Sequence, residues 1–565
     1  MPTERRSFLD RPILSGALLL IFLLQAARAS LIKSPVFDEP AHIGAGLSYL
    51  KTGEFKVNLQ HPPLLKEIAA VPLLLRGVRW PVSQEDWDRI VELRDASYQW
   101  RLGADVIFGN DPDQVLFWSR LPFLLLSTLL GWLLFVWGRK LFGGAAATGA
   151  VLLYTLDPTI LAHGYLVTTD VGFAAFAVLF FYALWSYLEH RTPRRLLTCS
   201  LALGGMMGTK FSAIFLLPVA AVLVFWAVRL IPASVPRRLS SLADPYASDD
   251  PAQRFVWGLY ALLVMGAVAS VVLHLLYLLP GNPFLYLKGM LMVNADHDRT
   301  YLAFMAGHFQ PRFLTYYIVA YLLKEPIASL ILVAAGLWAI LRPGGSTTLD
   351  RAFVLLPPAA ILIAHSLLSD DLGIRYIIPA LPFLYLAGGA GVAWLLRGGG
   401  WRRAAVGLLG LWMAVEAAAI YPDHLSYFNE LACLPGEAGR IGLDGGTACG
   451  PLWFDDSNVD WGQGLKQLRD YLAAHYPHQS VLLAYFGSTR PERYGIDSRP
   501  IGLDDLVRPP VPGVYVLSSH FLARGIGVLR QRYLDGPDNW LLHARPTAVV
   551  GHAYSVYDIP SAPGR

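Results

Sequence analysis

The sequence has few charged residues and few cysteines for its length. Charged side chains make up 16% of the 565 residues, whereas soluble globular chains carry roughly 25%. The formal net charge is only +4, and no cluster of basic residues is interleaved with aromatic ones, so nucleic acid is excluded as a partner. The 3 cysteines form no Cys-x-x-Cys pair and no Cys/His pair with zinc spacing, so no structural zinc site is predicted.

The sequence is rich in long apolar stretches. Hydrophobic residues make up 54% of the chain, and several stretches approach the roughly 20 residues needed to cross a bilayer. The sequence therefore predicts an α-helical polytopic membrane protein with membrane lipids around it. The first apolar run, about 12–32, follows Arg5, Arg6 and Arg11. It is too long for a cleaved signal peptide, which predicts an anchor with a cytoplasmic N-terminus.

The pattern of apolar runs and basic loops predicts about eleven transmembrane helices. They are expected at 12–32, 115–137, 144–163, 171–188, 255–279, 353–368, 376–396 and 404–420, with two short spans within 196–229 and one within 313–341. Arginine and lysine gather in the loops that this topology places in the cytoplasm. The long loops 33–113 and 280–312 then lie on the outer side.

An odd number of spans leaves the C-terminal part outside. We therefore divide the chain into a transmembrane module, 1–420, and an extracytoplasmic domain, 421–565. Runs such as GVYVLSS have strand composition and LKQLRDYLAAH has helical periodicity, which predicts a small soluble α/β domain. In an oxidising outer compartment Cys433 and Cys449 are expected to form a disulfide.

The first outer loop contains an acidic pair and a basic, proline-stiffened segment. Asp38 and Glu39 precede Pro40, a common start of a helix, so a capping role is one interpretation. Two carboxylates exceed what one cap needs, and a carboxylate here can take a proton from an acceptor hydroxyl. The segment from His61 to Lys66 reads HPPLLK and can present Lys66 to a phosphate, or Lys66 can anchor an interfacial helix.

Three further charged residues fall on the predicted outer side. Asp170, Lys210 and Arg375 lie at the mouths of apolar spans, where a helix cap or an interfacial anchor is the simpler interpretation of each. Together with Asp38 and Lys66 they combine carboxylates with several cations. Such a group suits a substrate with a phosphate at the membrane surface, because cations stabilise the charge that grows on a leaving phosphate.

These motifs resemble a known family. FDE at 37–39, HPPLLK, TTD at 168–170 and GTK at 208–210 are similar to motifs of the type C glycosyltransferase superfamily. The nearest branch is family 39, which includes protein O-mannosyltransferases and lipid A aminoarabinose transferases. GIRYIIPALPFL, YPDHLSYFNELA and DSNVDWGQGL resemble segments of bacterial phospholipid carrier-dependent members. The resemblance covers residues from about 36 to 500, which is most of the chain.

The resemblance implies a type C glycosyltransferase fold and roles for individual residues. Asp38 matches the catalytic aspartate, with Glu39 beside it. Residues expected to bind the donor phosphate are Lys66, Lys210 and Arg375, and Asp170 matches a second acidic position. Substrate contacts are expected from His61, Asp170, Asp456, Asn458, Asp460 and Trp461. For the last four, a polar network that orders the loop is the alternative.

Two segments depart from the family pattern. Gly464 stands where aspartate is expected, and Cys433 with Leu434 where a glycine pair is usual. Both departures lie outside the proposed reaction centre, so they place in doubt only the detailed role of the C-terminal part.

The sequence thus predicts an inverting glycosyltransferase of the bacterial inner membrane. It moves a sugar from a polyprenyl phosphate carrier to a hydroxyl of a protein, lipid or glycan on the outer face. No metal or cofactor is assigned. One alternative is a transporter or flippase, which tends to show repeated bundles and charges at mid-membrane. A weaker alternative makes the C-terminal domain a sensor or scaffold with the bundle as its anchor.

Overall fold

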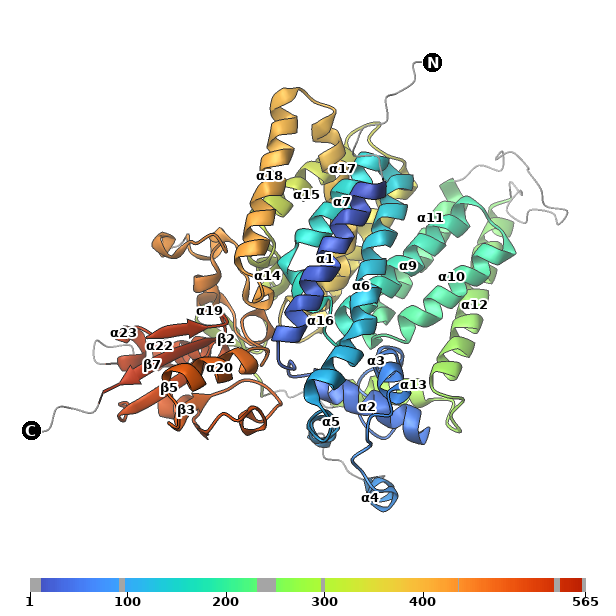
Figure 1. The fold of residues 1–565 in the computed structure, drawn as a ribbon. Helices are drawn as coiled ribbons and strands as arrows, with labels where there is room; N and C mark the ends of the chain where they lie inside the picture. Colours follow the sequence, from blue (N-terminus) through green and yellow to red (C-terminus); the bar gives the residue numbers. More distant parts are fainter. Residues whose placement is uncertain are drawn as a thin grey trace, which may run out of the picture.

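A computed structural model describes residues 12–90, 97–230, 250–295, 300–434, 436–532 and 539–560 of the chain. Most of these residues belong to helices that run side by side in one bundle (Figure 1). Six of the described helical segments are long and apolar enough to cross a membrane: α1 (Pro12–Ile32), α6 (Pro112–Phe142), α9 (Thr169–Glu189), α12 (Pro251–Leu276), α16 (Thr348–Leu368) and Ile374–Leu396, which joins η4 (Ile374–Ala380) to α17 (Leu381–Leu396).

Other predicted spans coincide with bent or interrupted helices. The pair α14 (Tyr316–Lys324) and α15 (Ile327–Leu341) is bent by 113° and counts as a seventh span if taken as one. The shorter helices include α7 (Gly144–Leu156), α8 (Pro158–His163), α10 (Pro193–Met207), η3 (Phe211–Leu216) and α11 (Leu217–Leu230). Another helix, α18 (Gly400–Ala419), packs against α7, α15 and α17. A polytopic helical membrane protein is confirmed, with six or seven of the predicted spans meeting these criteria in the described residues.

Local chemistry explains where the predicted 144–163 span is interrupted. The side chain of Asp157 accepts a hydrogen bond from the backbone N–H of Ile160, and Pro158 occupies the first turn of α8. An aspartate cap followed by proline starts a new helix, so the apolar run does not continue as one.

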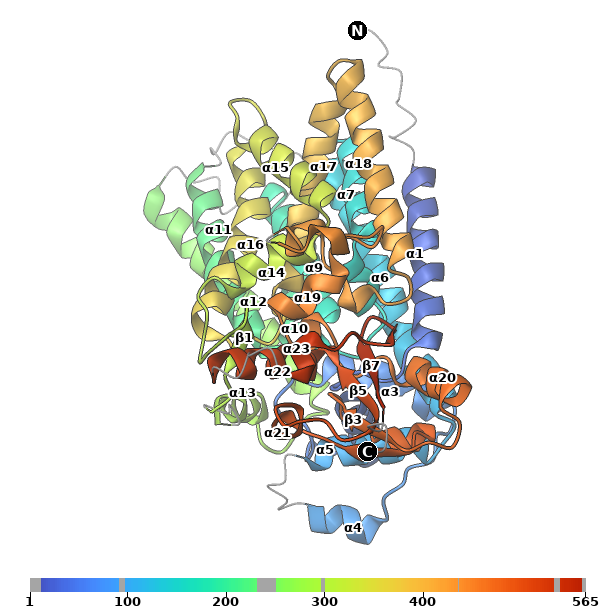
Figure 2. The same ribbon diagram turned by 90° about the vertical axis from the view of Figure 1, so that its left-hand side faces the viewer.

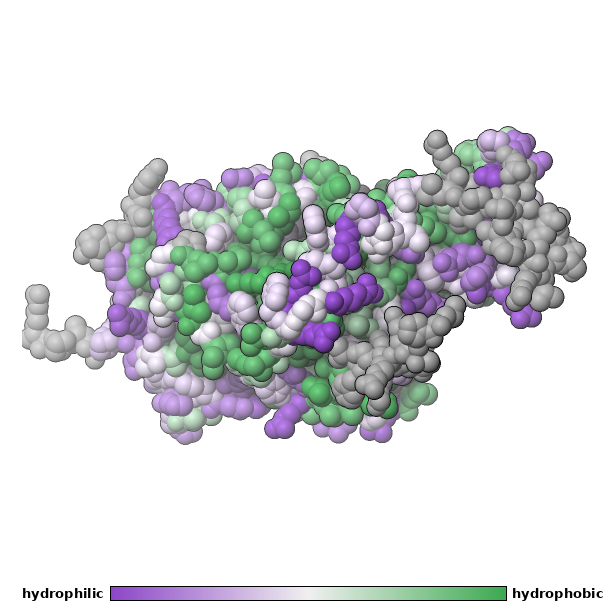
Figure 3. Space-filling model, turned by 90° about the horizontal axis from the view of Figure 1, so that it is seen from above, coloured by the Kyte–Doolittle hydropathy of each residue, from purple (hydrophilic) through white to green (hydrophobic). Residues whose placement is uncertain are grey.

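The flanks of the bundle are apolar. On α12, the side chains of Leu263 and Val271 are 63% and 60% exposed, which suits a lipid-facing helix. Figure 3 looks onto the end of the bundle that carries the N-terminus, and there hydrophilic side chains lie among surrounding hydrophobic ones.

The predicted outer loops and the C-terminal domain gather at one end of the bundle, opposite the N-terminus (Figures 1 and 2). The first loop supplies α2 (Glu39–Thr52), α3 (Leu64–Leu75), α4 (Gln84–Arg89) and α5 (Tyr98–Phe108). The second supplies α13 (Leu285–Ala295) and the antiparallel hairpin of β1 (Ala303–Met305) and β2 (His308–Gln310). The shared end agrees with the predicted common side of these segments.

The C-terminal part contains a small mixed sheet, as the strand-like runs predict. Its strand order is β4-β3-β5-β7-β6, from β3 (Val481–Ala484), β4 (Ser498–Pro500), β5 (Gly513–Ser518), β6 (Ala548–Val550) and β7 (Tyr554–Ile559). β3 runs parallel to β4 and β5, whereas β7 is antiparallel to β5, with Val516 opposite Val556. The helices of this part are α20 (Leu465–His475), α21 (Leu503–Leu506), α22 (Ser519–Gln531) and α23 (Trp540–His543).

Residues just after 420 pack with the bundle. They form the short turns η5 (His424–Ser426), η6 (Glu430–Ala432), η7 (Ala438–Arg440), η8 (Thr447–Cys449), α19 (Gly450–Trp453) and η9 (Asp456–Asn458). Phe428, Phe454 and Trp461 belong to the same buried cluster as the transmembrane helices, whereas a second core begins at Leu465. The packing therefore changes near 465, about 45 residues beyond the predicted domain boundary at 420. The short turn η10 (Pro491–Tyr494) belongs to the second part.

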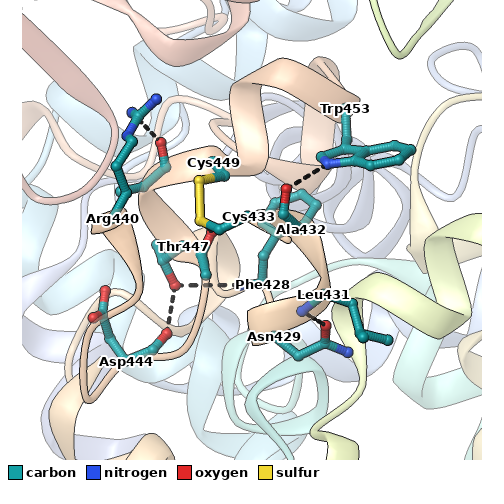
Figure 4. The surroundings of a disulfide bond; sticks show 12 residues. Phe428, Asn429, Leu431, Ala432, Cys433, Arg440, Asp444, Thr447, Cys449 and Trp453 are labelled. Carbon is teal, nitrogen blue, oxygen red and sulfur yellow. Dashed lines mark hydrogen bonds between the residues drawn. A yellow bond between two sulfur atoms is a disulfide. The ribbon is translucent and has the colours of Figure 1, made fainter. Parts of the chain in front are cut away.

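The predicted cysteine partners lie in this connecting segment. Cys433 and Cys449 are joined by a disulfide with a Cα–Cα distance of 5.4 Å, and both are buried. Figure 4 shows it between η6 and η8, beside Phe428 and Trp453. The remaining cysteine, Cys199, is free and buried. The bond closes a loop over a sequence separation of 16 residues.

We expect a Cys433→Ser, Cys449→Ser double variant to unfold about 2–4 kcal/mol more easily, because the cross-link restricts the unfolded chain. Thermal unfolding in detergent compares the two proteins. Thiol labelling of the denatured, unreduced wild type is expected to modify Cys199 and miss the other two cysteines. Labelling of all three without reductant contradicts the disulfide.

Candidate active site

Asp38 stands at the start of α2 and directs its carboxylate toward a cation. As the N-cap residue it makes no side-chain capping hydrogen bond, so the simple capping interpretation does not describe it. Its Oδ2 instead accepts a hydrogen bond from Nη1 of Arg375 at 2.8 Å, and its side chain keeps 22% exposure. The carboxylate is thus ion-paired and still reachable.

Glu39 has a different environment, although it is the next residue. Its side chain is fully buried and pairs with Arg120 of α6, with Nε–Oε1 and Nη2–Oε2 distances of 2.8 and 2.6 Å. The backbone N–H groups of Val36 and Val167 donate to the same carboxylate, each at 3.0 Å. Four hydrogen bonds occupy both oxygens. This geometry connects the first loop to the bundle and leaves neither carboxylate oxygen of Glu39 without a partner.

Arg375 lies between aromatic rings. Its guanidinium is 4.5 Å from the ring centroid of Trp461 and 5.3 Å from that of Tyr376. Cations stack favourably on aromatic faces. Trp461 reaches this position because its backbone oxygen accepts a hydrogen bond from Phe37 N–H at 2.8 Å. The C-terminal part therefore forms one wall of the site that begins at Asp38.

Asp170 and Lys210, each predicted to lie on the outer side, form an ion pair in the structure. Lys210 Nζ donates to Asp170 Oδ1 at 2.7 Å, although 40 residues separate them. The same ammonium lies 4.7 Å from the Tyr376 ring centroid. Tyr376 is thus shared by Lys210 and Arg375, so both cations occupy one locality.

The Lys66 side chain forms its hydrogen bonds within the first outer loop. Its buried ammonium donates to the backbone oxygens of Asn58 and His61 at 2.6 and 2.8 Å, to Asn58 Oδ1 at 3.1 Å and to the Tyr49 hydroxyl at 2.9 Å. The His61 ring lies 5.1 Å from that of His42, which follows Asp38 by one helical turn. Lys66 therefore shapes the loop that carries His61.

Burial dominates the acid–base properties of these loop residues. It raises the pKa of Asp38, while the Arg375 guanidinium lowers it. It lowers the pKa of His42 to about 3 and also lowers those of His61 and Lys66. Both imidazoles are consequently neutral at ordinary pH. A carboxylate with a raised pKa accepts a proton more readily, which suits a general base.

The four predicted residues of the DSNVDWGQ segment have separate environments. Asn458 is buried, and its Oδ1 accepts from the backbone N–H of Ile374 at 3.0 Å. Asp460 accepts from Gly462 N–H at 2.9 Å, and burial raises its pKa to about 7. Asp456 has a positive φ of 53°, and burial raises its pKa while Arg375 lowers it. The hydrogen bonds of Asn458 and Asp460 order the loop, whereas Trp461 and Asp456 adjoin Arg375.

Sequence reasoning missed buried cations, among them Arg120 and Lys324. Arg120 lies within the predicted span 115–137, and Lys324 ends α14 just before the bend. A charged residue inside an apolar span is a signal for function or pairing, so Arg120 was detectable, although its partner was not.

In the part of the chain that the structure describes, no group of three or more His, Cys, Asp or Glu side chains is placed to hold a metal ion. The first loop does contain Asp-x-Asp tripeptides at 86–88 and 111–113. Asp86 is 65% exposed on α4, and Asp111 caps α6.

Comparison with known proteins gives one family match. Residues 100–240 match the sequence model of the dolichyl-phosphate-mannose-protein mannosyltransferase family. A search of curated protein sequences gives no match. Among solved structures, the chain is similar to ArnT from Cupriavidus metallidurans bound to undecaprenyl phosphate, at 15% identity and a TM-score of 0.48 over 96% of this chain and 97% of that one.

A second similar structure is the Archaeoglobus fulgidus oligosaccharyltransferase in its apo form, at 12% identity and a TM-score of 0.43 over 97% of this chain and 75% of that one. Likenesses of this size identify no substrate. The similarity to the dolichyl-phosphate-mannose-protein mannosyltransferase family thus rests on residues 100–240, and it agrees with the relationship that the motifs predict.

Proposed function

We propose that the chain is an inverting glycosyltransferase that uses a polyprenyl-phosphate-linked sugar and a hydroxyl acceptor. The observation that carries the proposal is the ion pair of Asp38 and Arg375 beside the pair of Asp170 and Lys210. A carboxylate able to accept a proton thus lies next to two cations able to bind a phosphate. The family match supports the same class of reaction.

In this mechanism Asp38 removes the proton of the acceptor hydroxyl as its oxygen attacks the anomeric carbon. The bond between that carbon and the phosphate oxygen breaks on the opposite side, so configuration is inverted. The bonding electrons leave with the polyprenyl phosphate. Arg375 and Lys210 bind the phosphate, and their contacts strengthen as its charge grows. Phosphate is a good leaving group, so the step needs no general acid.

The other predicted site residues support this centre in distinct ways. We propose that Glu39 holds Asp38 in place through its pair with Arg120. We propose that Lys66 holds the loop of His61 rather than the phosphate, because its ammonium already contacts acceptors of Asn58, His61 and Tyr49. The neutral imidazole of His61 can exchange hydrogen bonds with sugar hydroxyls. Asp456 lies close enough to Arg375 for the guanidinium to lower its pKa.

We propose that the protein lies in a bacterial inner membrane with its N-terminus in the cytoplasm. The shorter helices then complete about eleven spans, and the end that carries the site and the C-terminal part faces the periplasm. The disulfide supports this orientation, because disulfides persist in oxidising compartments.

The activity is tested by mass spectrometry of glycans and lipids from cells with the wild-type protein and with the Asp38→Asn variant. Wild-type cells are expected to contain a glycosylated acceptor that the variant cells lack, with the unused lipid-linked sugar accumulating in the variant. A transporter instead predicts that both strains make the same glycans when the substrate is supplied on the outer side. Identical glycan and lipid profiles contradict the proposal.

A further inference from the structure

Lys324 is a buried cation that the proposed mechanism does not use. It ends α14, immediately before the 113° bend into α15, and is 2% exposed. Its Nζ donates to the backbone oxygens of Asn458 and Leu425 at 2.6 and 2.7 Å and lies 4.5 Å from the ring centroid of Phe428. Removing an ammonium from water costs several kcal/mol. A cation in such a place therefore calls for a specific role.

Lys324 bonds the backbone of Asn458, and the side chain of Asn458 bonds the backbone next to Arg375. Asn458 Oδ1 accepts from Ile374 N–H at 3.0 Å, and Ile374 directly precedes Arg375. Asn458 Nδ2 donates to the Tyr316 hydroxyl at 2.9 Å, which fixes the amide from its other end. The connection from Lys324 to Arg375 thus consists of two hydrogen bonds, with Asn458 and Ile374 between the two cations.

A second contact fixes the same backbone. Ser457 Oγ donates to the backbone oxygen of Leu372 at 2.7 Å. Gly373, the next residue, has a φ of +107°, and a Cβ added there would lie 2.2 Å from Ser457 Oγ. This close approach requires glycine. Residues 457 and 458 therefore hold both ends of the turn that leads into Arg375.

We propose that Lys324, acting through Asn458, is a positioning residue that holds Arg375 against Asp38 and the donor phosphate. The inference rests on the proposed function, because the position of Arg375 matters only if it binds that phosphate. Lys324 touches no substrate in this scheme. It holds the carbonyl of Asn458, and Asn458 holds the turn. Loss of the ammonium leaves two buried carbonyls without donors, so the loop is expected to shift and move Arg375.

The test compares Lys324→Met and Asn458→Ala with the wild type and with Asn110→Ala. Asn110 is a matched control because its amide also donates to backbone oxygens, those of Arg79 and Val106 at 3.0 and 2.8 Å, and these lie in the first loop rather than in the Arg375 turn or beside Lys324. Full-length proteins in nanodiscs are titrated with undecaprenyl phosphate. We expect about tenfold weaker binding for the two test variants and wild-type binding for Asn110→Ala.

The pH profile of kcat/KM gives a second readout that a stability loss alone does not move. The charged groups that face Asp38 are Arg375, Lys210, Asp170 and Asp456, and Arg375 lowers the pKa of Asp38. If Arg375 moves away, that pKa rises and more Asp38 is protonated at a given pH. The acidic limb of the profile is then expected to shift to higher pH in both test variants. In a Lys324→Arg variant, which keeps a cation at this position, we expect a smaller shift than in Lys324→Met.

The outcomes separate the two proposals. A wild-type protein that neither binds undecaprenyl phosphate nor transfers a sugar contradicts the proposed function. Wild-type activity, together with test variants that lose thermal stability but keep wild-type affinity and acidic limb, contradicts the positioning role alone. If Lys324→Met does not fold, Asn458→Ala and Ser457→Ala remove the same contacts to the turn, and an unchanged affinity and acidic limb in both contradicts the inference.

Discussion

Asp38→Asn is expected to reduce sugar transfer by about 10²–10⁴-fold, the usual contribution of a general base, and to leave the protein folded. The amide has nearly the same size as the carboxylate. Its oxygen can still accept the hydrogen bond that Arg375 Nη1 donates to Asp38 Oδ2 at 2.8 Å in the wild type. It cannot take the proton of the acceptor. Transfer is measured with purified protein and a labelled lipid-linked sugar, and folding by thermal unfolding in detergent.

Asp113→Asn is the matched control. Asp113 is an aspartate of the first outer loop that forms an ion pair with Lys466 at 2.5 Å, and its side chain is 72% exposed. Exposed ion pairs contribute about 0–1 kcal/mol, so this variant is expected to keep wild-type transfer. Equal activity of Asp38→Asn and Asp113→Asn contradicts the role of Asp38.

Glu39→Gln is expected to cost about 3–5 kcal/mol of folding free energy, the usual effect of breaking a buried ion pair. The neutral amide leaves the charge of Arg120 without compensation in a fully buried place. The measurement is the midpoint of thermal or denaturant unfolding in detergent. In the proposed mechanism Glu39 only supports the start of α2, whereas Asp38 takes the proton of the acceptor. The activity of the folded fraction of Glu39→Gln is therefore expected to fall less than that of Asp38→Asn.

Glu54→Gln provides the comparison for Glu39. Glu54 pairs with Lys56 at 2.6 Å, and its side chain is 45% exposed, so its loss is expected to cost no more than about 1 kcal/mol. If Glu39→Gln unfolds at the same midpoint as Glu54→Gln, the buried pair does not stabilise the fold as argued. A stable Glu39→Gln protein that has lost all transfer assigns Glu39 to catalysis instead.

The class of protein and the common location of several candidate site residues could be predicted from the sequence. Apolar runs of sufficient length predicted the bundle, and strand-like runs predicted the C-terminal sheet. Charge placement brought Asp38, Asp170, Lys210 and Arg375 to one side, and in the structure they form two neighbouring ion pairs. These predictions succeed because hydropathy and span ends are properties of the sequence itself.

Tertiary geometry decides what the sequence left open. Asp38 and Glu39 look alike as neighbours, but the start of α2 directs one toward Arg375 and the other toward Arg120, which is 81 residues away in the chain. No local pattern carries that distinction. The place of Trp461 beneath Arg375 depends on the C-terminal part docking against Phe37. Lys324 gave no motif, since its acceptors are backbone oxygens.

Span lengths show a similar limit. Hydropathy averages over a window, so it joined α7 and α8 into one span and did not register the cap at Asp157. Breaks of this kind depend on one polar side chain and a proline.

The most direct test of the central claim follows the lipid carrier itself. Purified wild-type protein in liposomes is given a labelled polyprenyl-phosphate sugar and a mixture of membrane lipids and periplasmic proteins as acceptors, and free polyprenyl phosphate is measured by mass spectrometry. A glycosyltransferase releases carrier in proportion to the sugar that appears on an acceptor, and Asp38→Asn releases almost none. Intact donor after incubation with wild type, or equal release by both proteins, contradicts the account.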